Sequence, residues 1–321
     1  MMAVSSGKRL KVASRDQFAY HCLKELNVGC CRELKPNCDY GNPQHPERIP
    51  NAMTLPKARF VTVYHDENAH NFSLSPVTAE VLAQWSAKTG SWGVLIREHN
   101  PYLLLGPKDR RLPLLDDAVH WVHTQGYPVY MRIGGGSAVL LDRTCLSFAV
   151  SRPCRDLTTW QRNFQEMAQP VIDGLKTLGV DACFGRAAGS YCEGPFDLIS
   201  HDGRKIAGIA QAIRGGSALV SGMILIQQDP LATTSFIQEF YRRAGSEQVL
   251  NAEAVTALKF DPQFRKVGIG EVGHALASGF KQHFRLHPEP FSQMEWDQCR
   301  TLEPARRVGI TSVEQIAGSI P

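Results

Sequence analysis

The sequence lacks the features that mark membrane, secreted and nucleic-acid-binding proteins. No uninterrupted apolar run approaches the ~18 residues of a transmembrane helix, and the first residues lack the apolar core of a signal peptide. The 35 basic and 31 acidic residues leave a net charge of only +4, without a block of like charges. We therefore expect a cytoplasmic protein that binds neither nucleic acid nor membrane.

Nucleotide-binding and disulfide signatures are also missing. The run Gly134-Gly135-Gly136 has no strand–GxGxxG–helix unit around it, and the spacing of a P-loop is absent. The nine cysteines are odd in number and match no disulfide framework. In a cytoplasmic protein they are expected to be reduced thiols.

Residues 1–52 differ in character from the rest of the chain. They are polar and mixed in charge, and they contain Cys22, Cys30, Cys31 and Cys38. A small metal site is one interpretation, but the spacing is not that of C-x₂-C pairs. We favour a poorly ordered extension, or an upstream start with the true start at Met53.

From about residue 55 the pattern is that of a folded α/β (α+β) protein. Strands dominate the middle of the chain and helices its end, which predicts a mixed, largely antiparallel sheet flanked by helices. The expected strands are 59–64, 92–96, 101–105, 129–132, 138–141, 146–150, 180–184, 195–200, 204–213 and 218–227. The expected helices are 75–90 with Ser75 as cap, 115–126, 158–178 kinked or split at Pro170, 231–243, 246–258, 269–285, and a short one from the capping box Ser292–Glu295.

One hairpin organises the candidate chemistry. Asp202-Gly203 lies between two apolar segments, which predicts a type I′ turn between the strands 195–200 and 204–213. Lys205 then begins the returning strand. Cys192 lies between Gly189 and Gly194, on the loop that enters the hairpin.

Cys192 is the candidate nucleophile. Most free cysteines are small buried hydrophobes, and Cys145, Cys154 and Cys183 are expected to be so. A loop thiol between glycines is better placed for reaction, and a cation such as Lys205 would increase its thiolate fraction. A Cys–Lys pair could transfer acyl groups through a thioester. Alternatively, Lys205 is a solvated surface lysine. A Cys–His hydrolase is less favoured, since only His201 is near in sequence.

The glycine run and the arginine before it suggest a ligand site. Three glycines between strands allow backbone to pass close to a ligand, although a plain turn or bulge explains them equally well. Arg132 could hold an anion or a carbonyl oxygen, or could form a surface ion pair.

Several motifs in this order resemble a known superfamily. Arg132–Asp142, together with Phe196-Asp-Leu and Gly203–Gln211, resembles the paired motifs of the biotin/lipoate protein ligases and octanoyltransferases. Ser190-Tyr-Cys-Glu-Gly194 resembles the cysteine motif of the transferase branch. The likeness is greatest to the cysteine-dependent octanoyl/lipoyl amidotransferases, which move an acyl group from the glycine-cleavage H protein to lipoyl domains, and it covers roughly residues 55–285.

This resemblance implies a fold and a set of site residues. The fold would be the class II synthetase-like catalytic domain, over residues 53–290, followed by a helical tail over 291–321. Cys192 would accept the acyl group, and Lys205 matches the lysine of the family site. The implied substrate-binding residues are Arg132, Gly134, Gly135, Gly136, Ala138 and Gly208, with no metal.

The resemblance also implies an activity and its partners. Acyl carrier protein or the H protein would donate an octanoyl or lipoyl group, and lipoyl domains of 2-oxoacid dehydrogenases would accept it on a lysine, without a cofactor. The alternative is a lipoate or biotin ligase that uses ATP and Mg²⁺. Such ligases usually carry a histidine a few residues after the glycines, where this chain has Leu141. A third possibility is a non-catalytic binder of lipoyl domains.

Overall fold

The computed structural model describes residues 55–67 and 69–309. The interpretations of residues 1–52 and of Met53 lie outside this part of the chain, as does the end of the expected tail. None of the helices within it combines the length and hydrophobicity that a membrane span requires.

Strands and helices alternate through the first half of the described chain, and helices prevail near its end. The strands are β1 (Lys57–Val63), β2 (Trp92–Arg97), β3 (Tyr102–Leu105), β4 (Val129–Met131), β5 (Val139–Leu141), β6 (Cys145–Pro153), β7 (Ala182–Gly185), β8 (Asp197–Ser200), β9 (Lys205–Arg214), β10 (Ser217–Leu225) and β11 (Arg285–Pro288). The helices are α2 (Ser75–Thr89), α3 (Leu115–Thr124), α4 (Trp160–Thr177), α5 (Pro230–Arg243), α6 (Ile269–His283) and α7 (Gln293–Arg306).

Two sheets form the framework. The large sheet has the order β11-β1-β2-β6-β10-β9-β8-β7. Strand β1 runs parallel to both of its neighbours, and the other pairings are antiparallel. A small sheet has the order β4-β3-β5. The expected mixed, largely antiparallel sheet flanked by helices is confirmed.

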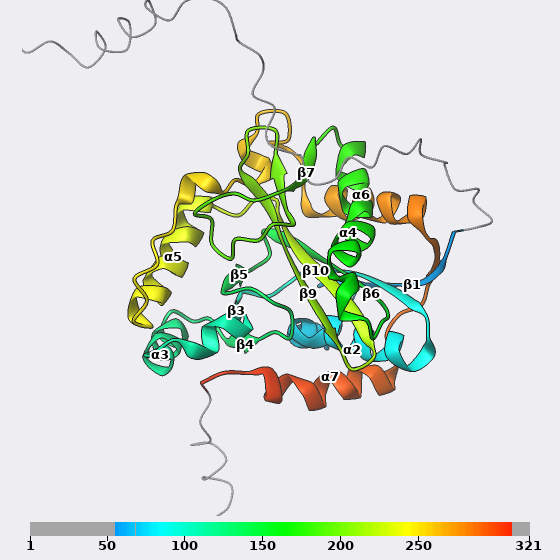
Figure 1. Cartoon of the computed structure of the whole chain (residues 1–321), viewed down its shortest axis with the longest axis horizontal. Coiled ribbons are helices and arrows are strands. Elements are labelled where there is room, and N and C mark those ends of the chain that lie inside the picture. The colour runs from blue at the N-terminus through cyan, green and yellow to red at the C-terminus, as the bar shows by residue number, and fades with distance from the viewer. Residues whose placement is uncertain (1–54, 68, 310–321) are drawn as a thin grey trace, which may run out of the picture. The chain divides into compact units, whose positions relative to one another are not determined.

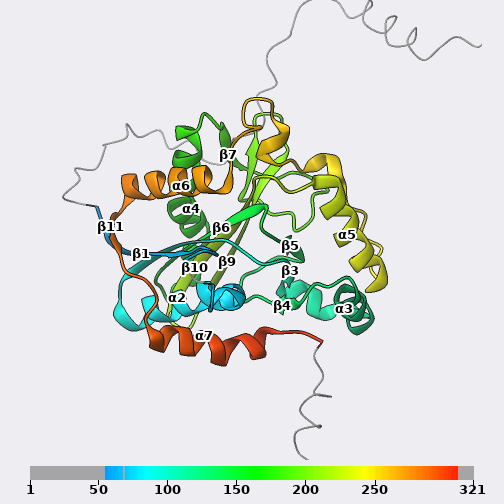
Figure 2. The same ribbon diagram turned by 180° about the vertical axis from the view of Figure 1, so that it is seen from behind.

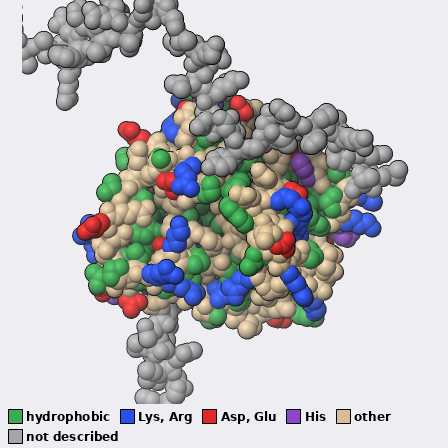
Figure 3. All heavy atoms as spheres, in the orientation of Figure 1, with side chains coloured by type: hydrophobic (Ala, Val, Ile, Leu, Met, Phe, Trp, Pro, Cys, Tyr) green, Lys and Arg blue, Asp and Glu red, His purple; other side chains and the backbone are tan. Residues whose placement is uncertain are grey.

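Helices cover both faces of the large sheet (Figures 1 and 2). Side chains alternate along a strand, so β6 directs Leu146, Phe148 and Val150 into the core under α4 and α6, and Ala149 into the core under α2 and α7. A third core joins the small sheet to α3 and α5. Figure 3 shows basic, acidic and apolar side chains interspersed over the visible face.

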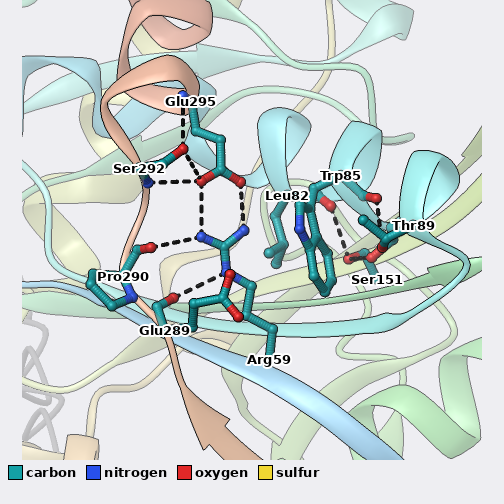
Figure 4. A network of polar contacts seen from close by, with 10 residues as sticks. Arg59, Leu82, Trp85, Thr89, Ser151, Glu289, Pro290, Ser292 and Glu295 are labelled. Atoms are coloured by element: carbon teal, nitrogen blue, oxygen red, sulfur yellow. Dashed lines mark hydrogen bonds and ion pairs between the residues drawn. The ribbon is translucent and has the colours of Figure 1, made fainter.

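Helix α7 is attached to the sheet through a buried ion pair (Figure 4). Arg59 of β1 donates to a carboxylate oxygen of Glu295 at 2.9 Å and to the carbonyl of Pro290 at 2.7 Å. Ser292 accepts from the Glu295 N–H, and Glu295 accepts from the Ser292 N–H, which confirms the predicted capping box. Trp296 and Cys299 of the same helix are buried in the core that it shares with α2.

Two helix predictions need correction. Helix α2 has Leu74 as its cap, because a 3₁₀ turn over Phe72–Leu74 runs directly into it and places Ser75 inside the helix. Helix α4 runs through Pro170 as one element, so the expected alternative of a split is wrong, whereas a kink stays a prediction. Buried residues on both sides of the proline, Met167 and Val171, pack into the core, and this packing offsets the lost hydrogen bond.

The helix expected over 246–258 does not form. Only two 3₁₀ turns occur there, at Ala252–Ala254 and Leu258–Phe260. The backbone is used for contacts with the candidate site instead: Asn251 N–H donates to the Gly189 carbonyl at 2.8 Å, and Thr256 N–H donates to the Lys205 carbonyl at 2.9 Å. Tertiary hydrogen bonds therefore override local helix propensity in this segment.

The predicted hairpin exists, but its turn is of another type. A type I′ turn needs positive φ at both central residues, whereas of the pair only Gly203 has it, at 81°. Gly203 N–H donates to the Ser200 carbonyl, and Ser200 N–H donates to the Arg204 carbonyl, both at 2.9 Å. This pattern is a three-residue loop that ends in a left-handed glycine, and it still places Lys205 at the start of β9.

Candidate active site

Cys192 lies on the loop between β7 and β8 in an unusual backbone conformation. Its φ is 48°, and no other non-glycine residue in the described part of the chain has a positive φ. Its sulfur accepts hydrogen bonds from Nη2 of Arg132 and from the backbone N–H of Ser137, both at 3.3 Å. A cation and a backbone donor therefore face the sulfur, where each can interact with the charge that a cysteine carries when it reacts as a nucleophile.

Carbonyl oxygens of strand β3 and of the loop between β4 and β5 fix Arg132 in this position. Its guanidinium donates to the carbonyls of Leu104 at 3.2 Å, Gly135 at 3.0 Å and Ser137 at 2.7 Å. No carboxylate among residues 55–67 and 69–309 forms an ion pair with it. The surface ion pair considered from the sequence is therefore not what the structure has, and the charge of Arg132 faces the cysteine.

The glycine run lets the sulfur and the guanidinium come together. Gly136 has a φ of 96°, and a Cβ there would lie 2.7 Å from Sγ of Cys192 and 2.8 Å from Nη2 of Arg132. Any larger residue would displace one of these two groups. Gly135 N–H donates to the Gln211 carbonyl at 2.9 Å, which ties the loop to β9.

A buried network holds the other end of the same loop. The N–H of Ala138 donates to the hydroxyl of Tyr241 at 2.9 Å, and this hydroxyl donates to Asp109 at 2.9 Å. Burial raises the pKa of Asp109 and of Tyr241. The N–H of Ala138 therefore already has a hydrogen-bond acceptor within the protein, the hydroxyl of Tyr241.

Lys205 is buried and has its own acceptors. Only 1% of it is exposed, so the solvated-lysine alternative is wrong. Its Nζ donates to the carbonyls of Tyr191 at 3.0 Å and Cys192 at 2.9 Å, and it pairs with Asp197 at 3.0 Å. An ammonium has three N–H donors, so these acceptors can use all of them. The side chain holds the backbone of Cys192, whereas Arg132 is the cation beside its sulfur.

Asp197 completes the support of Lys205. It accepts from the N–H groups of Gly194 at 2.9 Å and Ile209 at 3.1 Å. Burial raises its pKa, while Lys205 and both N–H groups favour the charged carboxylate. Gly208 keeps space for the lysine, because a Cβ there would lie 3.2 Å from Nζ.

A pocket enclosing about 440 Å³, part of it open to solvent, begins at Cys192. Of the predicted site residues, Arg132, Cys192 and Gly208 line it directly. Its apolar wall consists of Leu104, Val139, Leu141, Ile209, Ala210 and Met223. The pocket lies between the large sheet and the small sheet, and its apolar lining suits the hydrocarbon chain of a ligand.

Sequence reasoning missed several supporting residues. They are Ser137, which donates to the sulfur, and Asp109, Tyr191, Asp197 and Tyr241. Asp197 had a detectable signal, since it is the one acid within the apolar run 196–200. The others are contacts between distant segments, which a single sequence does not reveal.

The remaining cysteines in the described part take no part in the pocket. Cys145, Cys154 and Cys299 are free thiols, as expected, and burial raises the pKa of Cys145 to about 12. Cys183 is disulfide-bonded, so the expectation of reduced thiols throughout is wrong at this position. Among residues 55–67 and 69–309, no group of three or more histidine, cysteine or acidic residues is arranged to hold a metal ion.

The backbone of Cys192 gives a test of this loop. The left-handed region costs a non-glycine residue about 1 kcal/mol or more, which is at least what glycine loses in entropy elsewhere. We expect Cys192→Gly to unfold at the same or a higher temperature than Cys192→Ala. The same pair of substitutions at Ser190, where φ is not positive, should show the usual order, with alanine more stable. An alanine advantage at both positions would contradict the left-handed conformation.

Comparison with known proteins identifies relatives over most of the described part of the chain. The family model for the lipoyl protein ligase A/B catalytic domain matches residues 76–281. The octanoyl-[GcvH]:protein N-octanoyltransferase of Exiguobacterium sp. is 34% identical over 158 residues, which are 48% of this chain and 56% of that protein. The one from Geobacillus kaustophilus is 28% identical over 196 residues, 60% and 67% of the two chains. The chain thus spans about half the length of most such relatives.

Solved structures share the fold. A bipartite lipoate protein ligase from Thermoplasma acidophilum aligns over 77% of this chain and 92% of its own, with a TM-score of 0.58 and 21% identity. A lipoate-protein ligase A bound with ATP aligns over 77% and 94%, also with a TM-score of 0.58 and 21% identity. Because the family model covers more than half of the sequence, the chain belongs to the lipoyl protein ligase A/B catalytic domain family.

Proposed function

We propose that this protein moves an octanoyl or lipoyl group from a carrier protein to a lysine of a lipoyl domain, through a thioester on Cys192. The observation that carries the proposal is a cysteine sulfur at an apolar pocket, in contact with a cation and a backbone N–H. The names of the curated relatives support octanoyl as the group and GcvH, the glycine-cleavage H protein, as the donor. Acyl carrier protein is the other candidate donor.

The reaction balances without a further reactant. With octanoyl-GcvH as the donor, the Cys192 sulfur attacks the carbonyl carbon of the acyl-lysine amide. The C–S bond forms, the C–N bond breaks, and the thiol proton goes to the departing amine. In the second half, the amine of the acceptor lysine attacks the thioester and the sulfur takes a proton back. Arg132 and the Ser137 N–H stabilise the sulfur each time it carries negative charge.

The pocket explains why the group would be an acyl chain. Each methylene that leaves water contributes about 0.8 kcal/mol to binding, and the wall beside Cys192 is apolar over Leu104, Val139 and Ile209. Binding energy from this chain can hold the reacting carbonyl at the sulfur, which is the main benefit of proximity in catalysis.

An ATP-dependent ligase is the second candidate, and two residues disfavour it. Leu141 stands where such ligases usually carry a histidine, and it lines the pocket with 2% exposure. Cys192 would have no chemical task in a ligase, which activates its substrate as an adenylate. We therefore propose that the protein works without ATP or Mg²⁺ on lipoyl domains of 2-oxoacid dehydrogenases in the cytoplasm.

A transfer assay distinguishes the candidate functions. The full chain is incubated with octanoyl-GcvH or octanoyl-carrier protein and an apo lipoyl domain, and the proteins are followed by intact mass. We expect the lipoyl domain to gain one octanoyl group without ATP. Pyrophosphate release from ATP and free lipoate, with no transfer from either carrier, would identify a ligase. Binding of the lipoyl domain without either reaction would identify a non-catalytic binder.

A further inference from the structure

A turn of basic residues lies beside the candidate site, and the proposed reaction does not use it. The turn is Pro107–Arg111, a 3₁₀ helix that follows β3. Its Lys108, Arg110 and Arg111 are exposed, and none of them forms an ion pair within the described part of the chain. We call these three residues the basic turn. Their charge can therefore meet an acidic group of another molecule.

The acidic residues around the basic turn have other roles. On α5, which shares a core with α3, Glu239 pairs with Arg242 and Arg243. Asp116 and Asp117 lie in the first turn of α3, where the dipole of a helix stabilises acidic side chains. Neither of the two forms an ion pair among residues 55–67 and 69–309. The three positive charges are therefore not matched by a carboxylate at ion-pair distance.

The scaffold holds the basic turn in place. Asp109, the one buried residue of this turn, accepts from the Gly106 N–H at 2.8 Å and from the Tyr241 hydroxyl at 2.9 Å. After the turn, the Leu114 N–H donates to the Ala244 carbonyl at 3.1 Å. A surface that its own scaffold already orders loses little freedom when a partner binds. The backbone of the basic turn is thus prepared for binding.

The basic turn borders the candidate site through one layer of backbone. Gly106, which precedes the turn, packs so closely on the glycine run that a Cβ there would overlap the carbonyl of Gly136. Gly136 in turn packs against the sulfur of Cys192. Leu104, three residues before the turn, lines the pocket. Figure 3 shows basic side chains on the visible face around β4 and the start of α3.

An apolar side chain is exposed beside the basic turn. Leu114 is 51% exposed, and Pro113 next to it is exposed as well. Protein–protein interfaces have this composition, with apolar residues at the centre and arginine enriched over the rest of the surface. The segment from Lys108 to Leu114 therefore has the character of a contact surface for a protein.

We propose that the basic turn and Leu114 form the docking surface for the protein that presents the reacting lysine, and that this partner carries acidic residues around that lysine. The inference rests on the proposed function, in which both half-reactions bring a lysine of another protein to Cys192. Donor and acceptor would use the surface in turn, because both must reach the same sulfur. Opposite charges raise the rate at which such partners associate.

Charge reversal in the full chain tests the docking surface. The basic-turn variant carries Lys108→Glu, Arg110→Glu and Arg111→Glu. A control variant makes the same change in net charge at three other exposed residues that form no ion pair in the described part, namely Lys57→Glu, Lys281→Glu and Arg285→Glu. Lys57 and Arg285 are neighbours on β1 and β11, and β11 lies across the molecule from α3 (Figures 1 and 2).

Transfer from octanoyl-GcvH to an apo lipoyl domain is measured over a range of partner concentrations. At low salt, we expect kcat/KM of the basic-turn variant to fall at least about tenfold, because electrostatic steering raises association rates by about 10–10³-fold. The value of kcat should change much less. At about 1 M salt, where the Debye length is about 3 Å, most of the difference from the wild-type protein should disappear. The control variant should behave as the wild-type protein does.

Two results of this assay would overturn the proposal. One is an unchanged kcat/KM in the basic-turn variant, and the other is an equal loss in the control variant, which would reflect net charge alone. Replacement of the basic turn with three glutamines adds no negative charge beside Asp109, and it serves if the glutamate variant does not fold. It should give a smaller loss in the same direction, and no loss would again overturn the proposal.

Calorimetry with the apo lipoyl domain separates docking from catalysis. The wild-type protein should bind the domain at least about tenfold more tightly than the basic-turn variant does. Weaker binding by the variant, without any transfer by the wild-type protein, would reject only the transferase function. Transfer by the wild-type protein, with equal affinities and equal kcat/KM in the two proteins, would reject only the docking surface.

Discussion

Replacing Cys192 with alanine should abolish the acyl-enzyme and lower single-turnover transfer by at least about 10⁴-fold, the scale at which loss of a nucleophile acts in enzymes. The reason is that only the sulfur can form the thioester, and without it Arg132 and the Ser137 N–H have no nucleophile to stabilise. In the wild-type protein, exposure to the octanoyl donor should add the mass of one octanoyl group. Hydroxylamine should remove that mass, since it cleaves thioesters.

Cys154 provides the matched control for this experiment. It is also a free, half-buried thiol, but it lies beyond the end of β6 and does not line the pocket. Cys154→Ala should keep both the adduct and the rate. Transfer by Cys192→Ala at a rate comparable to that of the wild-type protein would show that the thioester mechanism is wrong.

The parts of the fold that could be predicted are those encoded in local patterns. The strands 92–96 and 146–150 are runs of apolar and β-branched residues that end at polar residues, and both form as expected. The helix predicted over 246–258 was wrong because the backbone of this segment hydrogen-bonds to Gly189 and Lys205, which are distant in sequence. The turn before Lys205 was wrong in type because Gly203 alone takes a left-handed conformation.

The site shows the same division. Cys192 lies within hydrogen-bond distance of Arg132 and beside Gly136, although it comes from a different motif than these two residues. Which cation faces the sulfur was not predictable from spacing, because the direction of Lys205 is set by Asp197 and by two loop carbonyls.

Substitution of Lys205 should lower transfer by about 10²–10³-fold, comparable to the loss of one preorganised group in an active site. Lys205 holds the carbonyl of Cys192, and without it the left-handed loop loses its anchor. Lys205→Arg should fail nearly as badly as Lys205→Ala, since a guanidinium is wider than an ammonium and Gly208 leaves no further space. Single-turnover transfer measures both.

Stability should fall as well, because Lys205→Ala leaves the Asp197 carboxylate buried without its partner. Breaking a buried pair in this way costs about 3–5 kcal/mol. Arg204→Lys is the matched control: Arg204 is half-exposed and, within residues 55–67 and 69–309, forms an ion pair only with Asp202, so its replacement should change neither the rate nor the unfolding temperature.

A double variant separates the effect on folding from the effect on positioning. Lys205→Met combined with Asp197→Asn removes both charges, so much of the lost stability should return. Transfer should stay impaired, because no ammonium then holds the carbonyls of Tyr191 and Cys192. If Lys205→Arg transferred as fast as the wild-type protein, Lys205 would be reduced to a generic positive charge. The double variant cannot restore the hydrogen bonds from Lys205 to the carbonyls of Tyr191 and Cys192. If it nevertheless recovered its transfer rate together with its stability, the lysine would contribute to transfer only by stabilising the fold.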